Sequence, residues 1–353
     1  MADKNIANIL KKFGKKYNIT TANNAFIPER IPTGIDTLDI ITGGGYPTGR
    51  VVELYGYYSV GKTLATLKCI AANQALGKVC VFVDTENTFD YEWAAVQGVN
   101  TEELIVYSEI PYGELGLDFI KELILGEVAD LIVLDSIEGL VPKNELEKEA
   151  EAVIMGKKAI LMNKAARVLN SVIGTSERKP TLILINQIRD TMNMYDPTTT
   201  PGGKGIKHVA AMRIELSKGK TVTDSSTKEK KHVEIRAKTN KNKTSREGKY
   251  GYWTMYIGGD EIFPSGYCDC SPFVITQAKY IGLITQAGAW HYYGDEKFQG
   301  KTEFVNYLYD NPEIYRDFMK KIINGCEVNG SDEKEVTESG ESTGKQIERE
   351  IDD

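Results

Sequence analysis

Five short apolar runs alternate with helix-like stretches through the first half of the chain. The runs are apolar at nearly every position, as strands covered on both faces of a sheet are. The stretches between them repeat their apolar residues at helical spacing. The predicted strands are 51–55, 79–83, 104–107, 131–134 and 182–185, and the predicted helices are 62–76, 90–97, 113–126 and 156–173. This pattern predicts an α/β fold with a mainly parallel central sheet.

The pattern differs on both sides of this unit. The N-terminal segment holds a short apolar helical stripe that either lies on its own domain or docks on a neighbouring subunit as an oligomerisation arm. Residues 209–260 alternate like antiparallel strands, and helix signals follow at 273–286 and 311–323. We predict four parts: an N-terminal helix and linker (1–30), an α/β core (31–270), a small α+β C-terminal domain (271–325) and a disordered acidic tail (326–353).

Charge is distributed unevenly along the 353 residues, whose net charge is −7. Residues 327–353 hold ten acidic and three basic residues, whereas residues 218–249 hold eleven Lys or Arg and four acids. Separate blocks of opposite sign predict a basic working surface and an acidic tail. The apolar runs are shorter than the roughly 18 residues of a membrane span, the N-terminus lacks a signal-peptide pattern, and the five cysteines form no C-x-x-C pair. We therefore expect a cytoplasmic protein with free thiols, and no membrane partner.

Residues 56–63, Gly-Tyr-Tyr-Ser-Val-Gly-Lys-Thr, fit the phosphate-binding pattern G-x-x-x-x-G-K-[ST]. A predicted strand precedes them and a predicted helix follows, which is the context that the pattern requires. In such a loop the backbone N–H groups point at phosphates, a lysine reaches the β- and γ-phosphates, and a hydroxyl ligates Mg²⁺. A chance glycine turn would lack the flanking elements. The predicted nucleotide-binding residues are Gly56, Tyr57, Tyr58, Ser59, Val60, Gly61, Lys62, Thr63 and Leu64.

Polar residues follow three of the predicted strands directly. They are Asp84 and Glu86, Asp135 and Ser136, and Asn186 and Gln187. Parallel sheets bind ligands at the carboxyl ends of their strands, so these side chains are candidates for chemistry. From the residues alone, Glu86 could be a catalytic base or a helix cap, and Gln187 could be a polar strand end. Asp135 ends an apolar strand, where a charge needs a cation nearby.

Six motifs in order, followed by one C-terminal stretch, resemble the RecA recombinase family over about residues 28–325. PTGIDTLDIITGGGYPTGR resembles the lead-in to its P-loop, VFVDTENTFD the segment of its catalytic glutamate, and LIVLDSIEGLVPK its second Mg²⁺ segment. LILINQIR resembles the γ-phosphate sensor, TTTPGGKGIKHVA the end of the mobile DNA-binding loop, and KTNKNK the interface lysines. LITQAGAWHYYGDEKFQGK resembles the small C-terminal domain. The divergent charged segments and Tyr57-Tyr58 indicate a divergent or bacteriophage member, similar to the recombinases called UvsX.

The resemblance implies a role for each site residue. Lys62 and the other P-loop residues would hold the triphosphate, and Thr63 and Asp135 would hold Mg²⁺. Glu86 would be the general base, and Gln187 would sense the γ-phosphate. Trp93 stands where the family often has an aromatic stacked on adenine, although such a residue is more often part of a core. Lys241 and Lys243 resemble the lysines that reach the ATP of the adjacent subunit in a head-to-tail filament.

DNA would lie against two loops, at about residues 147–157 and 188–207. The second is long, lacks periodicity and is rich in Thr, Pro and Gly, as functional loops are. The candidate DNA contacts are Met155, Gly156, Lys157, Arg167, Arg189, Tyr195, Gly202, Gly203, Lys204 and Lys207. Two features depart from the family. The first loop carries three glutamates, and His208 replaces an aromatic residue at the end of the second.

The resemblance implies an ATP-dependent recombinase that forms filaments on single-stranded DNA and promotes homologous pairing and strand exchange, with DNA-dependent ATP hydrolysis. Its cofactors would be ATP and Mg²⁺. Its partners would be single- and double-stranded DNA and further copies of itself, with single-strand-binding or loader proteins as other candidates, in the cytoplasm of a bacterial or phage-infected cell. Two alternatives stay open: a motor of the same fold such as a ring helicase, which would not need residues 271–324 or this DNA loop, and a regulatory paralogue that binds ATP without hydrolysing it. The intact set Lys62, Glu86, Asp135 and Gln187 argues against the paralogue.

Overall fold

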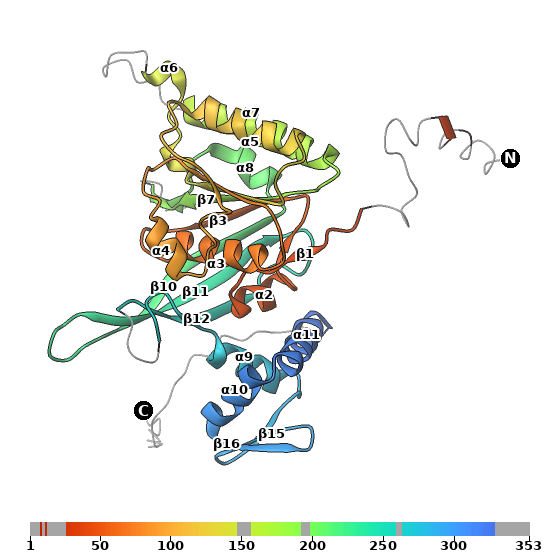
Figure 1. Cartoon of the computed structure of the whole chain (residues 1–353), viewed down its shortest axis with the longest axis vertical. Helices are drawn as coiled ribbons and strands as arrows, with labels where there is room; N and C mark the ends of the chain where they lie inside the picture. Colours follow the sequence, from red (N-terminus) through yellow and green to blue (C-terminus); the bar gives the residue numbers. More distant parts are fainter. Residues whose placement is uncertain are drawn as a thin grey trace, which may run out of the picture.

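The computed structural model describes residues 8, 11–12, 26–146, 157–191, 198–258 and 263–328. All five predicted strands form, and they are mutually parallel in the order β3-β7-β6-β4-β5 (Figure 1). Their bounds are β3 Val51–Gly56, β4 Cys80–Asp84, β5 Ile105–Tyr107, β6 Leu131–Asp135 and β7 Thr181–Gln187. The predicted α/β class is confirmed, and the predicted strand positions are correct to within one or two residues.

Four further strands extend this sheet on its β3 side. β10 (Met212–Thr223) lies parallel to β3, and β11 (Lys230–Asn242), β12 (Tyr250–Tyr256) and β13 (Cys268–Asp269) follow it in antiparallel order. The antiparallel pattern predicted for 209–260 is therefore correct. The distal part of the β10–β11 hairpin projects well beyond the body of the molecule (Figure 1), and it carries most of the basic block.

Helices cover both faces of the sheet (Figure 1). Side chains alternate between the faces of a strand, so Val52 and Leu54 of β3 enter one apolar cluster and Val51 enters the other. The first cluster includes α2 (Asp36–Thr42), α3 (Lys62–Gln74) and Ala94 of α4 (Tyr91–Val96). The second includes α5 (Gly113–Leu125), α7 (Lys157–Thr175) and α8 (Gly203–Val209). Because helices cover both faces of the sheet, nearly every residue of these strands is apolar.

The C-terminal part packs three helices with a small antiparallel sheet (Figure 1). Its elements are α9 (Ser271–Tyr280), β14 (Thr285–Ala287), β15 (Trp290–Tyr293), β16 (Glu296–Gln299), α10 (Gly300–Asp310) and α11 (Pro312–Val328). The helix predicted over 273–286 is too long, because the chain turns at Gly282 with φ of 72° and enters β14. The second predicted helix, 311–323, corresponds to α11.

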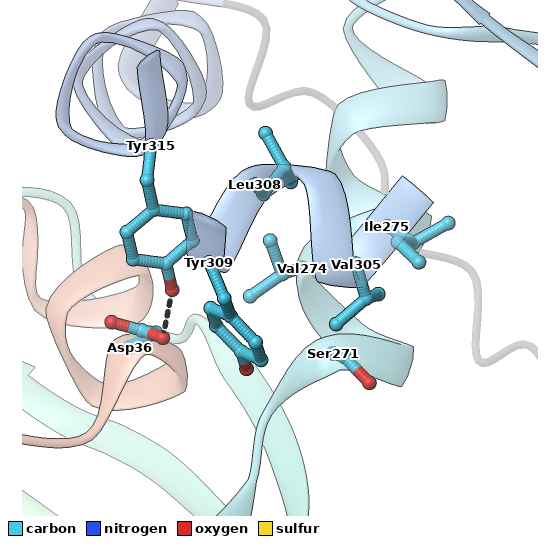
Figure 2. A pocket seen from close by; sticks show the side chains of 8 residues that line it. All are labelled: Asp36, Ser271, Val274, Ile275, Val305, Leu308, Tyr309 and Tyr315. Carbon is cyan, nitrogen blue, oxygen red and sulfur yellow. Dashed lines mark hydrogen bonds between the residues drawn. The ribbon is translucent and has the colours of Figure 1, made fainter. Parts of the chain in front are cut away.

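The C-terminal part docks on α2 across a small pocket (Figure 2). The pocket is lined largely by apolar side chains of α9 and α10, with Tyr309, Tyr315 and Asp36 at one side. The Tyr315 hydroxyl of α11 donates a hydrogen bond to the Asp36 carboxylate of α2. Burial raises the pKa of Asp36, which this hydrogen bond partly offsets. The contact joins one end of the predicted core to the predicted C-terminal domain.

Four cysteines of the described residues are free thiols: Cys69, Cys80 and Cys270 are buried, and Cys268 is partly buried. No helix of the described residues is long and apolar enough to cross a membrane. The predicted N-terminal helix falls largely outside the described residues, as does the chain after 328. The shorter elements are β1 (Arg30–Ile31), β2 (Tyr46–Pro47), a 3-10 turn at Ile137–Gly139, α6 (Lys143–Leu146), β8 (Arg189–Asp190) and β9 (Thr198–Thr199).

Candidate active site

The predicted P-loop connects β3 to α3, as its motif requires. Gly61 has a φ of 79° and precedes the first residue of α3, a conformation that favours glycine. Gly56 is needed for a different reason, because a Cβ atom there would lie 2.2 Å from the carbonyl oxygen of Leu216 on β10. The motif thus needs glycine at position 61 because of a turn, and at position 56 because two strands approach each other closely. The loop leads directly into the N-terminus of α3, a favourable setting for phosphate.

Lys62 lies inside this loop with only 8% of its surface exposed. Its ammonium donates hydrogen bonds to the carbonyl oxygens of Gly56 at 3.1 Å and Tyr57 at 2.7 Å. Burial lowers the pKa of Lys62, while the carboxylates of Asp135 and Glu86 act in the opposite direction. The side chain is therefore a cation held among neutral carbonyls, with acids close enough to influence it.

Thr63 and Asp135 form the second element of the site. The Thr63 hydroxyl donates to Asp135 Oδ2 at 2.6 Å, joining the first turn of α3 to the end of β6. Burial raises the pKa of Asp135 to about 6; the Thr63 hydrogen bond opposes the rise, and Glu86 and Asp84 add to it. No group of three or more His, Cys, Asp or Glu side chains that could hold a metal occurs among the described residues. Magnesium in nucleotide sites commonly uses one or two protein oxygens together with phosphate oxygens and water, which suits this pair.

Glu86 lies between side chains from two other strand ends. Its Oε1 accepts a hydrogen bond from the Ser136 hydroxyl, which follows β6, and one of 3.4 Å from Gln187 Nε2 at the end of β7. Asp84, only 1% exposed, accepts from the backbone N–H groups of Glu86 and Phe89 and so shapes the turn after β4. The polar residues that follow β4, β6 and β7 therefore lie together at one edge of the sheet, as the sequence predicted.

Trp93, Lys241 and Lys243 lie outside this cluster of strand-end residues. Trp93 belongs to α4, which Asp90 caps by accepting the Trp93 N–H at 2.9 Å, and its partly buried side chain packs against the first apolar cluster. Lys241 donates to the carbonyl oxygens of Lys207 and His208 at 2.6 and 3.1 Å, and Lys243 donates to that of His208 at 3.5 Å. Both lysines thus lie at the C-terminal end of α8, where free carbonyls attract cations. No hydrogen bond in the described chain joins them to the P-loop.

The candidate DNA contacts surround α7 and α8. Gly202 and Gly203 adopt φ of 89° and 74° where α8 begins, and the Gly205 N–H donates to Asn163 Oδ1 of α7 at 2.6 Å. Lys204 and Lys207 belong to α8, Lys157 begins α7, and Arg167 is exposed nearly three turns further along α7. Arg189 forms an ion pair with Glu138, which the sequence analysis did not foresee. Met155, Gly156 and Tyr195 lie outside the described residues.

A buried polar network that the sequence patterns did not indicate connects this region to the sheet. Glu53 of β3 is fully buried, pairs with Arg213 of β10 at 2.5 Å and accepts from Asn186 Nδ2 of β7 at 2.8 Å. Asn186 also donates to the carbonyl oxygen of Pro201 at 3.0 Å, just before α8. A charged residue inside a strand-like apolar run is the only sequence signal for such a pair, because its partners lie far away along the chain.

Comparisons with known proteins agree with this architecture. The family model for the RecA N-terminal domain matches residues 1–258, and that for the RecA C-terminal domain matches residues 273–327. Protein RecA of Aquifex aeolicus is 36% identical over 340 residues, covering 94% of this chain and 94% of that protein. Protein RecA of Nocardioides sp. is 35% identical over 341 residues, covering 95% and 94%.

Among solved structures, the crystal structure of the RadB recombinase covers 64% of this chain and 96% of its own, at 22% identity. Its TM-score of 0.47 is too low for this likeness to support an argument. The matches to the two domain models and to full-length relatives are sufficient without it. The chain, from its P-loop core to its C-terminal helices, belongs to the RecA family.

Proposed function

We propose that this protein is an ATP-dependent recombinase that assembles on single-stranded DNA as a helical filament and promotes homologous pairing and strand exchange, hydrolysing ATP when DNA is bound. One observation supports this most directly. Gln187 hydrogen-bonds Glu86 at 3.4 Å in the nucleotide site, and the chain passes from Gln187 straight into the predicted DNA loop. A residue in this position responds to both ligands, as a DNA-dependent ATPase requires.

The side chains present fit ATP and Mg²⁺. Within the described part of the chain, the hydrogen-bond partners of the Lys62 ammonium are backbone carbonyls, which a phosphate can replace. The Thr63–Asp135 pair offers hard oxygen ligands. When bound, Mg²⁺ supplies charge neutralisation between the β- and γ-phosphates. Trp93 would stack on the adenine ring from the first turn of α4. These assignments rest on the chemistry of the donors and on the family.

Glu86 is the residue we assign to proton abstraction. Ser136 and Gln187 both donate to its Oε1, so one oxygen is held and the carboxylate is oriented for a water molecule. Lys62 holds the transferred phosphoryl group and stabilises its developing charge. Lys241 and Lys243 act on the site of the adjacent protomer, so hydrolysis requires the filament.

DNA binding is assigned to the surface of α7 and α8 and to the base of the loop before α8. Lys157, Arg167, Lys204 and Lys207 are the basic residues we assign to phosphates, with Arg189 available once it leaves Glu138. The RecA C-terminal domain over residues 273–327 favours a recombinase over a ring helicase of the same fold. Cytoplasm of a bacterial or phage-infected cell is the proposed location, since the curated relatives are bacterial.

Electron microscopy tests the proposal. With single-stranded DNA and a slowly hydrolysed ATP analogue, the protein is expected to form helical filaments. Lys62→Ala is the matched control, because it removes the main charge on the β- and γ-phosphates and should abolish nucleotide-dependent filaments. Rings instead of filaments would support a motor, and normal filaments of Lys62→Ala would contradict the nucleotide-site assignment.

A further inference from the structure

Tyr57 of the P-loop makes a side-chain contact that the phosphate-binding motif does not require. Its hydroxyl donates a hydrogen bond to Asp190 Oδ1 at 2.6 Å, across 133 positions of sequence. Tyr57 contributes its backbone to the P-loop, whereas Asp190 is the second residue of β8. The bond therefore links the nucleotide loop to a different functional segment of the chain.

Asp190 stands at the base of the second predicted DNA loop. β8 pairs with β9 in antiparallel register, Asp190 opposite Thr198 and Arg189 opposite Thr199, so the two strands bracket that loop. Arg189 on the same strand is held by Glu138. A displacement of Asp190 would therefore move both strands of the base, including Arg189, which we assign to a DNA phosphate.

Tyr57 also contacts the lysine of the nucleotide site. Its carbonyl oxygen accepts from the Lys62 ammonium at 2.7 Å. The neighbouring Gly56 carbonyl accepts from Lys62 at 3.1 Å and from the Ile188 N–H at 3.1 Å. Residues 56–57 are thus bonded to Lys62 on one side and to residues 188 and 190 on the other. A phosphate competes for the same ammonium, so its arrival changes the bonding of Tyr57 directly.

We propose that Tyr57 is a positioning residue that transmits nucleotide binding to the DNA loop through its hydrogen bond with Asp190. When Lys62 turns toward phosphate, the Tyr57 carbonyl loses a donor and residue 57 is free to shift. The hydroxyl then carries Asp190 and the β8–β9 base with it. This route is separate from the Gln187–Glu86 contact. The inference rests on the proposed function, because it specifies how that site is coupled to DNA.

The measured quantity is the coupling ratio, defined as the affinity for a fluorescent oligo(dT) with saturating slowly hydrolysed ATP analogue divided by the affinity without nucleotide. Tyr57→Phe removes only the hydroxyl and keeps charge, ring and backbone. Its coupling ratio is expected to fall about threefold to tenfold, the range of one net hydrogen bond. Asp190→Ala removes the acceptor and should lower the ratio similarly, even if loss of its charge tightens DNA binding in both states.

The double variant Tyr57→Phe/Asp190→Ala distinguishes a shared bond from two separate effects. Because both single changes break the same contact, the double variant should lower the ratio no further than either one. Tyr91→Phe is the matched control: Tyr91 is an exposed tyrosine whose hydroxyl donates to Glu92 at 3.3 Å within α4, joining no two loops. It should keep the parent ratio. Thermal unfolding of each variant, expected to match the parent, excludes a general loss of structure.

The outcomes separate this inference from the proposed function. A parent protein whose DNA affinity does not respond to nucleotide overturns both. If the parent responds and Tyr57→Phe keeps its full ratio, the inference alone is overturned. A fall with Tyr57→Phe that adds to that of Asp190→Ala in the double variant contradicts transmission through their shared bond.

Discussion

Glu86 owes its orientation to residues that come from two other strands, Ser136 after β6 and Gln187 at the end of β7. Sequence patterns identified all three as strand-end polar residues, because a parallel sheet brings the carboxyl ends of its strands to one edge. Which oxygen accepts from which donor could not be predicted. The side-chain pairs Tyr57–Asp190, Arg189–Glu138 and Glu53–Arg213 were also missed, since each joins positions far apart in sequence.

Glu86→Gln should separate hydrolysis from binding. The amide cannot accept a proton from water, yet the phosphate-binding loop is unchanged. ATP-dependent DNA binding should therefore persist while the hydrolysis rate at saturating DNA falls about 10²–10⁴-fold, the usual contribution of a general base. Steady-state phosphate release with single-stranded DNA measures it. A rate near that of the parent would assign proton abstraction to another group.

Secondary-structure elements were predicted well where they are long and covered on both faces. The strands β3, β4, β6 and β7 are buried on both sides and their apolar runs are continuous, so their positions followed from the sequence. The sequence predicted an α+β make-up for the C-terminal part but did not place helix α10 or the strands β14, β15 and β16. These strands are only three or four residues long, too short for a clear alternation of apolar and polar residues. Helix α8 lies in a Gly-rich stretch that lacks periodicity, and its packing on α7 stabilises it.

The Tyr315–Asp36 bond between α11 and α2 should contribute measurably to stability. Tyr315→Phe is expected to lower the free energy of unfolding by about 1 kcal/mol, the net value of one partly buried hydrogen bond. Asp36→Ala removes the acceptor, so a double-mutant cycle with Tyr315→Phe, measured by urea denaturation, isolates the contact. A coupling free energy of zero would mean that the C-terminal part is held by its apolar contacts alone.

The raised pKa of Asp36 also predicts how stability depends on pH, and Asp36→Asn is the variant that tests it. The pKa of Asp36 in the folded protein is raised above 3.8 by burial, so the folded state binds the proton more tightly than the unfolded state. Its stabilising contribution is complete below pH 3.8 and is lost as pH rises through the raised pKa. The parent should therefore lose stability relative to Asp36→Asn as pH increases from 4. An unchanging difference between the two proteins would show that Asp36 does not titrate differently on folding.

At the scale of the whole molecule, catalysis is expected to depend on a second copy. Lys241 and Lys243 donate to carbonyls at the end of α8, and we propose that they reach the nucleotide of a neighbour in a head-to-tail assembly. Lys241→Ala/Lys243→Ala should be inactive alone. Mixed with Glu86→Gln protein, it should recover part of the ATPase activity, because some interfaces then pair an intact glutamate with intact lysines. Co-assembly without any recovery, at all mixing ratios, would argue against shared sites.

The acidic C-terminal sequence makes a prediction about duplex DNA. We expect residues 327–353 to compete with DNA phosphates for basic surface, because their acid excess matches the basic excess of residues 218–249. Since α11 continues to Val328, the truncation belongs after that residue. The truncated protein should bind duplex DNA more tightly, with an advantage that shrinks as salt rises. Equal affinities of both proteins at low and high salt would leave the tail a solubilising role only.

The four described thiols have a practical consequence for watching this protein assemble. A cysteine reacts with maleimide as its thiolate, and burial raises the pKa of Cys69, Cys80, Cys268 and Cys270, with values of about 12 for Cys80 and Cys268. With Cys326 changed to serine, one cysteine introduced at exposed Lys228, near the tip of the β10–β11 hairpin, would be the dominant labelling position. A dye attached there would report on the projecting hairpin as protomers join, while the four buried or partly buried native thiols react little with maleimide.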